Sequence, residues 1–558
     1  MHRTRHITAG SRVCLVALSL LILMGTAWAA GPRGHKKARP KGGRIVLVHA
    51  DRLHYDAMRN PEANILNGHV HFTHDNISLT CDSAYYYKNT NSFEAFGNVR
   101  MNQGDTLSLT GEYVKYDGDA QLAQARVNVH LRHRGSLLVT DSLDYDKLYE
   151  TGYFFGGGRL RDSGNTLVSN TGQYDVKSRD AVFNYHVELT NKKFTLTSDT
   201  LYYNTITKVS KIVGPSNIIS AGNKIYTEHG YYDTQRDYAQ LFDRSVVQNG
   251  RSTMTGDSMY YDKKNGRMKA IGNIIYNDKE SKNLLTGNYC EYSDTTGYAM
   301  ATDRAEVRVY SSPDTLYMHA DTFKIFSYNQ HTDSVYRIIH GYHKARAFRA
   351  DVQSVCDSLK YDSKDRRMTM YGNPIVWSNN QQLLGEEIQV FLNDSAVDSA
   401  HVLRQALLVQ ALDSSRYNQI ASRVMYAYFK DGKIDWSMAK GNVDVAYYPY
   451  GSDSVIVGLN RMQTTELRMY MKDKKMSHTW SAPATGTMYP LKMATKSEAL
   501  LDNFAWFDYI RPKNKDDIFE WKEKTAGTEL RETNRRQAPL QKLSDIAREK
   551  LRTATKDN

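Results

Sequence analysis

Polar and apolar positions along this chain recur together about every 30 residues, and one aromatic position marks each recurrence. Tyrosine fills the first nine of these positions, and each of the next three holds an aliphatic or aromatic residue. The twelve positions are Tyr55, Tyr86, Tyr116, Tyr145, Tyr174, Tyr203, Tyr232, Tyr261, Tyr292, Ile325, Tyr361 and Phe391. A period of this size is typical of stacked repeats, in which each repeat buries its apolar face only against its neighbours.

Two apolar columns accompany the aromatic column. An acidic or amide residue stands four positions before each aromatic, and eleven of the twelve residues at −3 from it are apolar, while eleven of those at +2 are apolar or small. The +2 column shares the parity of the aromatic, which predicts strands with one buried face. Both columns are candidates to line an apolar interior. The candidates are Leu79, Leu109, Leu138, Leu143, Leu167, Leu196, Leu201, Ile225, Met254 and Met259.

The five-residue offset between these columns predicts a bend in each strand. An odd offset places two side chains on opposite faces of a flat strand, so the chain must bulge near the acidic residue for both to face one core. Pairs such as Gly97-Asn98 and Gly272-Asn273 predict a second corner, because both residue types tolerate positive φ. We therefore expect an all-β fold, an elongated V-shaped or rolled β-jellyroll solenoid of about 12 repeats of about 30 residues.

The two ends of the chain differ from the repeats. Residues 1–29 have the basic start, apolar stretch and small-residue cleavage site of a signal peptide, and 30–44 form a basic linker. The repeats fill 45–395. A looser C-terminal β region follows over 396–510, with an aromatic cluster near its end that predicts a short closing helix. Residues 511–558 form a charged tail, partly helical or disordered.

Positive charge is concentrated in these flanks. Of the formal net charge of +12, residues 1–29 carry +3, 30–44 carry +6 and 511–558 carry +4, which leaves the body at −1. A nucleic-acid-binding protein concentrates positive charge on its fold. The distribution therefore argues against nucleic acid as a partner and leaves peripheral contact with an anionic membrane surface open.

The residues that could take part in catalysis or metal binding have structural explanations. No nucleophile elbow, zinc-binding helix, phosphate loop or Cys-x-x-Cys pair occurs. The acidic column recurs in every repeat with Asn or Glu as substitutes, which favours a structural corner over a catalytic pair. His69, His71 and His74 lack a further ligand to complete a zinc site. We expect no catalytic residue, metal or cofactor, and we expect Cys81 and Cys290 to be buried thiols, like Cys356.

The repeat resembles the OstA-like family. The residues that carry the resemblance are the segments 50–56 (ADRLHYD) and 140–146 (TDSLDYD), with corners such as 95–99 (AFGNV). This family is related to the periplasmic (LptA-like) bridge protein of lipopolysaccharide transport and to the N-terminal domain of the outer-membrane translocon for lipopolysaccharide assembly.

The resemblance implies a function that the columns support independently. Acyl chains of lipopolysaccharide, or of a related glycolipid, would lie in an apolar trough, in the periplasm of a diderm bacterium, and other β-jellyroll proteins would join edge to edge. A structural or adhesive exported solenoid with a filled core is the alternative. A polysaccharide-degrading β-helix is a third class, and it would show a special charged cluster on one repeat.

Overall fold

The computed structural model describes residues 43–525 except 59, 221, 281, 312–313, 331, 333, 394–396, 431–432, 453–454 and 473–474. The predicted signal peptide, nearly all of the basic linker and the tail beyond residue 525 lie outside the described residues. The described chain is almost entirely antiparallel β-strand, which confirms the predicted all-β class. No helix among the described residues is long and apolar enough to cross a membrane.

The chain divides into two compact units. The N-terminal unit comprises Met1–Arg134 and Val139–Phe154, and the C-terminal unit comprises Gly135–Leu138 and Phe155–Asn558. The N-terminal unit contains β1 (Val46–His49), β2 (Arg52–Tyr55), β3 (Asn64–His74), β4 (Ile77–Tyr87), β5 (Ser92–Gln103), β6 (Leu107–Asp117) and β7 (Leu122–His133). Two further strands, β8 (Ser136–Asp146) and β9 (Thr151–Asp162), contribute residues to both units.

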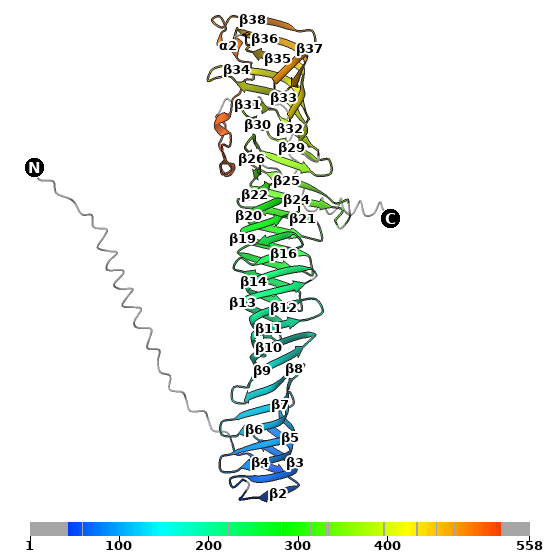
Figure 1. Ribbon diagram of the computed structural model, residues 1–558, viewed down its shortest axis with the longest axis vertical. Coiled ribbons are helices and arrows are strands. Elements are labelled where there is room, and N and C mark those ends of the chain that lie inside the picture. The colour runs from blue at the N-terminus through cyan, green and yellow to red at the C-terminus, as the bar shows by residue number, and fades with distance from the viewer. Residues whose placement is uncertain are drawn as a thin grey trace, which may run out of the picture. The chain divides into compact units, whose positions relative to one another are not determined.

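The C-terminal unit contains the remaining strands (Figure 1). They are β10 (Asn165–Asp175), β11 (Asp180–Thr190), β12 (Thr195–Asn204), β13 (Val209–Ser220), β14 (Asn223–Asp233), β15 (Tyr238–Phe242), β16 (Val246–Asn249), β17 (Ser252–Thr255), β18 (Ser258–Asp262), β19 (Arg267–Asp278), β20 (Asn283–Ser293), β21 (Tyr298–Thr302), β22 (Glu306–Val309), β23 (Leu316–His319), β24 (Thr322–Tyr328), β25 (Tyr336–Tyr342), β26 (Ala345–Arg349), β27 (Val352–Cys356), β28 (Ser358–Asp362), β29 (Arg367–Tyr371), β30 (Ile375–Ser378), β31 (Gln381–Leu384), β32 (Glu387–Leu392), β33 (Val397–Ala411), β34 (Tyr417–Lys430), β35 (Lys433–Tyr447), β36 (Leu459–Lys472), β37 (Lys475–Ser481) and β38 (Thr485–Tyr489).

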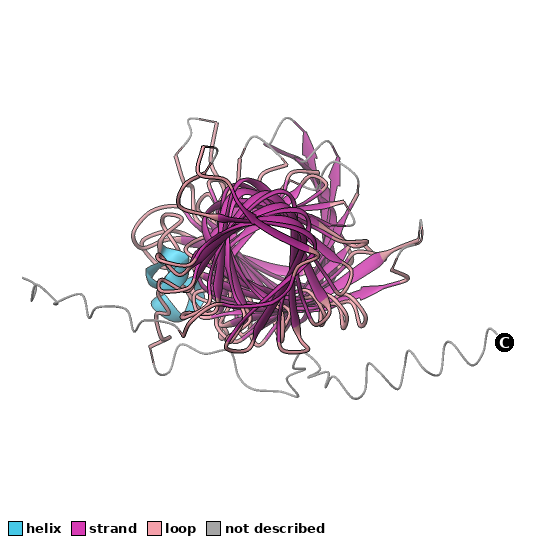
Figure 2. Cartoon of the chain, turned by 90° about the horizontal axis from the view of Figure 1, so that it is seen from below, coloured by secondary structure: helices cyan, strands magenta, loops and turns pink. Residues whose placement is uncertain are grey.

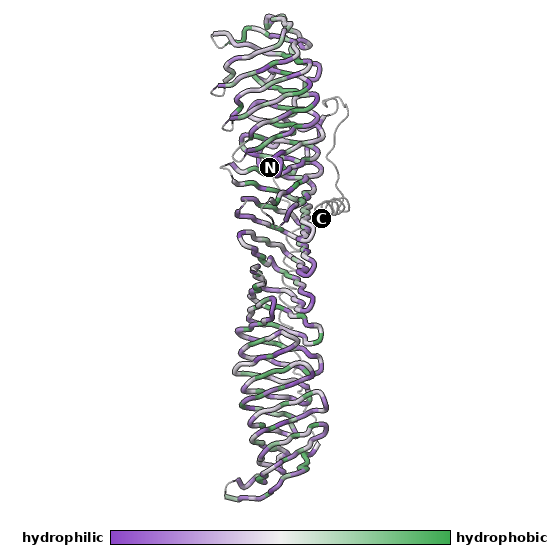
Figure 3. The backbone as a smooth tube through the Cα atoms, turned by 90° about the vertical axis from the view of Figure 1, so that its right-hand side faces the viewer, coloured by the Kyte–Doolittle hydropathy of each residue, from purple (hydrophilic) through white to green (hydrophobic). Residues whose placement is uncertain are grey.

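Each repeat is a hairpin of two strands that bend at the same corner. In the pair β4–β5 the register shifts between Thr80 and Ser83, where Asp82 lies, and the opposite strand is at Gly97-Asn98 there. The two corners expected from the sequence therefore lie side by side on one line. Because of this bulge, Leu79 and Ala84 are both 1% exposed, as the odd offset of their columns requires. Hydrophobic and hydrophilic positions alternate along the strands (Figure 3).

The short helix predicted near the end of the β region is present as short helical turns, one of which lies within 500–510. The segment 490–525, here called the C-terminal strap, holds only α2 (Lys496–Ala499), η1 (Asp508–Ile510) and η2 (Asp517–Phe519). It packs on the outer side of the strands (Figure 2), where Phe507 and Ile510 join a core with Trp377 and Val409. Gln382 fixes it by donating to Ala505 O at 2.8 Å and accepting from Phe507 N at 2.7 Å.

Candidate ligand-binding cavity

The C-terminal unit encloses a cavity of about 1670 Å³, here called the interior cavity. Its lining begins at Asn223 in β14 and reaches Met469 in β36. The strands that form it are the bent pairs of the repeat, so their inward-facing positions, which would otherwise meet in a core, face this space. Three rows of inward side chains and one polar rim make up its surface.

The first row runs across neighbouring strands on one wall. Each member is the direct cross-strand partner of the next, so the row follows from the register alone. The members are Ile225, Val247, Met254, Tyr276, Leu285, Val307, Met318, Ala347, Ser354, Val376, Leu383 and Leu408, and all of them line the cavity. At roughly 4.8 Å per strand, this row is about 50 Å long.

The second row lies on the other wall and continues the aromatic column of the sequence. Its members are Tyr261, Met268, Tyr292, Ala299, Ile325, Ile339, Tyr361, Met368, Val390, Ala400 and Ala427, paired in that order and all lining the cavity. A third row, nearer the corner, includes Cys290, Phe323, Leu359, Met370, Ile388, Val402 and Met425. These three rows are therefore almost wholly hydrocarbon, thioether and aromatic.

Polar residues at the strand ends form the rim of the cavity. Along one edge the rim residues are Asn223, Asn249, Ser252, Asp278 and Asn283, and along the other they are Asp294, Gly297, Ser327, Gln330 and Thr332. Such residues lie at or beside hairpin turns, which are surface positions. Since turns from both edges line the cavity, it reaches the surface between them.

In the cavity Tyr292 and Cys290 are held in their neutral forms, and two charged groups form an ion pair with each other. Burial, together with the nearby Asp294, raises the pKa of Tyr292 to about 12, and Tyr292 donates a hydrogen bond to Asp294 at 3.1 Å. Burial raises the pKa of the Cys290 thiol to about 12. Arg349 forms a two-pronged ion pair with Asp351, at 2.5 and 3.0 Å. An apolar interior with a polar rim suits an amphiphile whose hydrocarbon enters and whose head group stays at the surface.

Two of the ten candidate lining residues from the sequence, Ile225 and Met254, line this cavity. The other eight do not contribute to it and are at most 2% exposed. They are Leu79, Leu109, Leu138, Leu143, Leu167, Leu196, Leu201 and Met259. Whether any of the ten contacts a lipid stays a prediction.

Sequence reasoning missed most of the lining, although one signal marks it. The aromatic column itself, at Tyr261, Tyr292 and Tyr361, faces the cavity, whereas its alternation along the chain predicts only a buried strand face. Methionine becomes common in the inward columns of the same repeats, as at Met318 and Met370. Methionine is flexible and adapts to irregular or changing surroundings, so its enrichment is a usable signal for a non-uniform interior.

The histidines and cysteines that the sequence singled out have separate local partners. His69 contacts Asp51 at 2.8 Å, His71 contacts the Ser78 hydroxyl at 3.0 Å, and His74 contacts the Tyr116 hydroxyl at 2.6 Å. Within the described residues no cluster of His, Cys, Asp or Glu is arranged to hold a metal ion. The three described cysteines, Cys81, Cys290 and Cys356, are free and buried, as expected.

Comparison with known proteins adds a family relationship for part of the chain. Residues 43–199 match the family model described as OstA-like protein, which confirms the resemblance over that segment. Among solved structures, LptH, the LptA homologous periplasmic component of the conserved lipopolysaccharide transport device from Pseudomonas aeruginosa, matches at 18% identity with a TM-score of 0.11. That match covers 31% of this chain and 82% of LptH. No curated protein matches the chain.

Proposed function

We propose that this chain, which carries an OstA-like domain over residues 43–199, binds the acyl chains of lipopolysaccharide or a related glycolipid in its interior cavity. The function is non-catalytic: the protein carries lipid through the periplasm toward the outer membrane. The observation that supports this most is the cavity itself, with its three apolar rows and its polar rim.

The composition of the rows suits a mobile lipid. Burial of hydrocarbon stabilises the complex by about 0.8 kcal/mol per CH₂. The first row presents similar side chains on every strand, such as Leu285, Val307 and Met318, so neighbouring positions of an acyl chain have similar free energies. A lipid can therefore shift along the strands, because no single position binds it much more tightly than the next. Its sugars remain at the rim beside Asp278 and Asp294.

Partners of the same architecture fit the terminal strands of each unit. In the N-terminal unit, β1 and β2 leave Val46, Leu53 and Tyr55 exposed by 54, 58 and 60%. In the C-terminal unit, Trp480 in β37 and Met488 in β38 are about half exposed, at 49 and 54%. An exposed strand with apolar side chains favours pairing with a strand of another chain, so we propose edge-to-edge contacts with other β-jellyroll transport proteins.

A structural or adhesive solenoid remains the second candidate, because part of the interior is filled. In the C-terminal unit, inward residues of the early strands, such as Leu167, Leu189 and Leu196, are 0% exposed. A purely structural role predicts that no hydrocarbon enters any part of the chain.

Crosslinking with photo-leucine distinguishes the two candidate functions. Its diazirine side chain is nearly the size of leucine, so it can replace buried leucines. The protein is produced with photo-leucine, incubated with purified lipopolysaccharide and irradiated, and the crosslinked peptides are identified by mass spectrometry. We expect lipid adducts at Leu285, Leu383 and Leu408, which line the cavity. Adducts confined to exposed leucines such as Leu53 would reject lipid carriage and favour the structural solenoid.

A further inference from the structure

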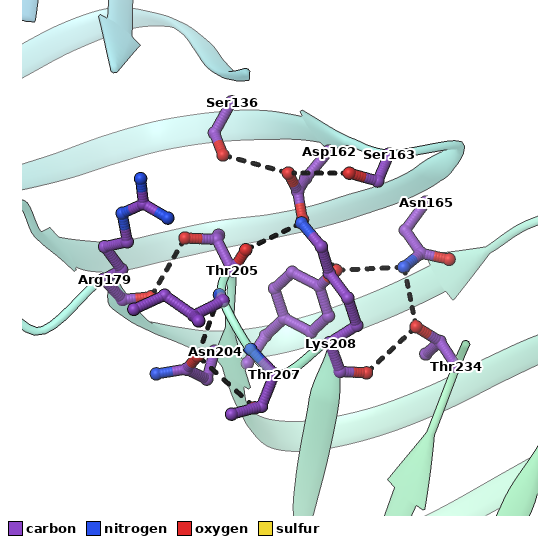
Figure 4. Close-up of polar contacts among 12 residues, drawn as sticks. Ser136, Asp162, Ser163, Asn165, Arg179, Asn204, Thr205, Thr207, Lys208 and Thr234 are labelled. Carbon is purple, nitrogen blue, oxygen red and sulfur yellow. Dashed lines mark hydrogen bonds and ion pairs between the residues drawn. The ribbon is translucent and has the colours of Figure 1, made fainter. Parts of the chain in front are cut away.

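A buried polar cluster joins the two edges of the rolled strands in the C-terminal unit, just before the interior cavity begins. Asp162 ends β9 and accepts a hydrogen bond from Lys208 Nζ at 2.6 Å (Figure 4). It also accepts one from the Tyr203 hydroxyl at 2.8 Å. Asn165 donates to the Tyr203 oxygen at 2.9 Å and to Thr234 at 2.8 Å. We call Asp162, Tyr203 and Lys208 the polar clamp.

The clamp connects residues that would be far apart in a flat sheet. Asp162 lies at the turn between β9 and β10, whereas Tyr203 and Lys208 flank the turn between β12 and β13, at the opposite ends of the antiparallel strands. Straight strands of about 11 residues would separate these ends by roughly 35 Å. The 2.8 Å bond therefore shows that the strands curl until their edges meet here.

Similar contacts close the edges over the next strands. Lys193 and Asp237 form an ion pair at 3.5 Å from opposite edges, and the Tyr232 hydroxyl donates to Asp237 at 2.5 Å. The rings of Phe194 and Tyr232 pack edge to face with centroids 4.5 Å apart, and both side chains are buried. Between the edges, hydrogen bonds and aromatic rings take the place that the cavity occupies further along.

The change from a filled interior to the open cavity can be followed along one row of cross-strand partners. Leu196 is 0% exposed, its partner Ile218 is 1% exposed and the next partner Ile225 is 6% exposed. Val247 and Met254, which follow Ile225, are half-buried and line the cavity. On the other wall the aromatic column runs from Tyr203 through Tyr232 to Tyr261, and Tyr261 lines the cavity as well.

We infer that the polar clamp ends the lipid-binding site, so that acyl chains occupy the strands beyond Ile225 and are excluded from those before it. This inference rests on the proposed lipid-binding function. Asp162 is 3% exposed, and a hydrocarbon chain inserted between the edges would strip its carboxylate of the Tyr203 and Lys208 donors without offering replacements. The clamp therefore sets how much of the roll a lipid can use.

The chemistry of the clamp supports exclusion over simple stabilisation. A buried ion pair contributes little net stability compared with well-packed apolar residues of similar volume, because both charges lose hydration. Apolar side chains at these positions would hold the edges together equally well. They would also present a surface that hydrocarbon can enter, whereas a satisfied carboxylate and ammonium do not.

The test compares photo-leucine adducts on the two sides of the clamp in the full chain, again with purified lipopolysaccharide. In the wild type we expect at least tenfold more adduct at Leu285 and Leu383 than at Leu196 and Leu201. In the variant Asp162→Leu/Lys208→Met, adducts at Leu196 rise to within a few-fold of those at Leu285. The exposed turn pair Asp413–Arg416, changed to Asp413→Leu/Arg416→Met, is the matched control and leaves the wild-type pattern unchanged.

Each result decides the question. Equal labelling of Leu196 and Leu285 in the wild type, or an unlabelled Leu196 in a folded clamp variant that still labels Leu285, overturns the inference while lipid binding stands. No adduct at Leu285 in the wild type removes the proposed function and the inference together. If the double variant does not fold, Tyr203→Phe removes only the hydroxyl, and the same rise at Leu196 is required of it.

Discussion

Asp82 occupies the space that a side chain on Gly97 would need. A Cβ added to Gly97 would lie 2.6 Å from Asp82 Oδ2, and Gly97 adopts a φ of +72°. The neighbouring Asn98 donates its amide to the same oxygen at 2.8 Å. Gly272, Asn273 and Asp257 repeat this arrangement, with a bond of 2.7 Å. The acidic column is thus one half of a corner whose other half is glycine and asparagine.

Gly97→Ala tests this corner, and we expect it to destabilise the N-terminal unit by about 2–3 kcal/mol, because left-handed backbone strain adds to the collision with Asp82. Gly104→Ala is the matched control: Gly104 also has a positive φ, of +57°, but nothing lies within 4 Å of an added Cβ. We expect it to cost about 1 kcal/mol. Urea denaturation followed by circular dichroism measures both, and equal losses would show that Asp82 does not matter.

A charge placed in the interior cavity should weaken lipid binding by about tenfold or more. Met318 in β23 lines the cavity, and Met300 in β21 is a half-buried methionine that does not. Met318→Glu replaces apolar contacts with a carboxylate, and losing even two CH₂ contacts weakens binding about tenfold. Displacement of a fluorescent fatty-acid probe measures this loss.

Met300→Glu, the control, should leave the affinity within about twofold of the wild type, a change of less than 0.5 kcal/mol. Equal weakening by both substitutions would place the probe outside the cavity. A wild-type affinity in Met318→Glu would show that this row does not contact hydrocarbon.

The fold was accessible from the sequence because its determinants are local. The columns at Leu79 and Ala84, with a corner between them, required a bulge whatever the rest of the chain did, and the structure contains it. The extent of the open interior was not accessible in this way. Leu196 and Leu285 are the same residue type at the same repeat position, yet one is packed and the other lines the cavity.

That difference depends on contacts between residues distant in sequence. Asp162 and Tyr203 close the edges beside Leu196, and no short-range pattern specifies their meeting. The docking of the C-terminal strap could not be predicted from the sequence for the same reason. Gln381 and Gln382 stand side by side in β31, and only the fold shows that Gln382 is 0% exposed and accepts a hydrogen bond from Phe507 N.

The native cysteines report on access to the cavity. The thiolate is the reactive form, and burial raises the pKa of Cys81, Cys290 and Cys356 to about 12. Reaction with an apolar maleimide at pH 8 should therefore be slow for all three and should rise about tenfold per pH unit up to pH 10, as the thiolate fraction grows.

Cys290 lines the cavity, so we expect it to react first and to be protected by lipopolysaccharide, as measured by mass spectrometry of labelled peptides. Cys81 serves as the internal control, with a similar pKa and no place in the cavity lining. Protection of Cys81 and Cys290 alike would point to a general change in stability.

Gln382 should be required for docking of the C-terminal strap. Its carbonyl accepts from Phe507 N at 2.7 Å and from Trp377 Nε1 at 3.0 Å. Gln382→Ala leaves both buried donors without an acceptor, for a loss of about 3 kcal/mol. We expect faster tryptic cleavage after Lys492 and Lys496, whereas Gln240→Ala on the outer face of β15 should not change the rate. Unchanged cleavage in Gln382→Ala would mean that apolar packing alone holds the strap.

His340 makes the stability of the C-terminal unit depend on pH. Its side chain is 1% exposed, neither ring nitrogen has a hydrogen-bond partner among the described residues, and it stacks on Tyr342 with ring centroids 5.5 Å apart. Burial, with a smaller contribution from Lys360 and Lys324, lowers the pKa of His340 to about 4. The unfolded chain therefore binds this proton more readily than the folded one.

The sign of the effect follows from that difference. Above pH 6.5 the residue is neutral in both states, and between pH 6.5 and about 4 only the unfolded state is protonated, so stability falls as the pH falls, by about 3 kcal/mol in total. His340→Phe keeps the stacked ring and removes the titration. We expect the melting temperature of the variant to exceed that of the wild type by a margin that widens from pH 7 to pH 4.5, whereas the exposed control His54→Phe should follow the wild type in parallel. A constant margin for His340→Phe would show that His340 is hydrated in solution, since a histidine in contact with water would keep the same pKa in both states.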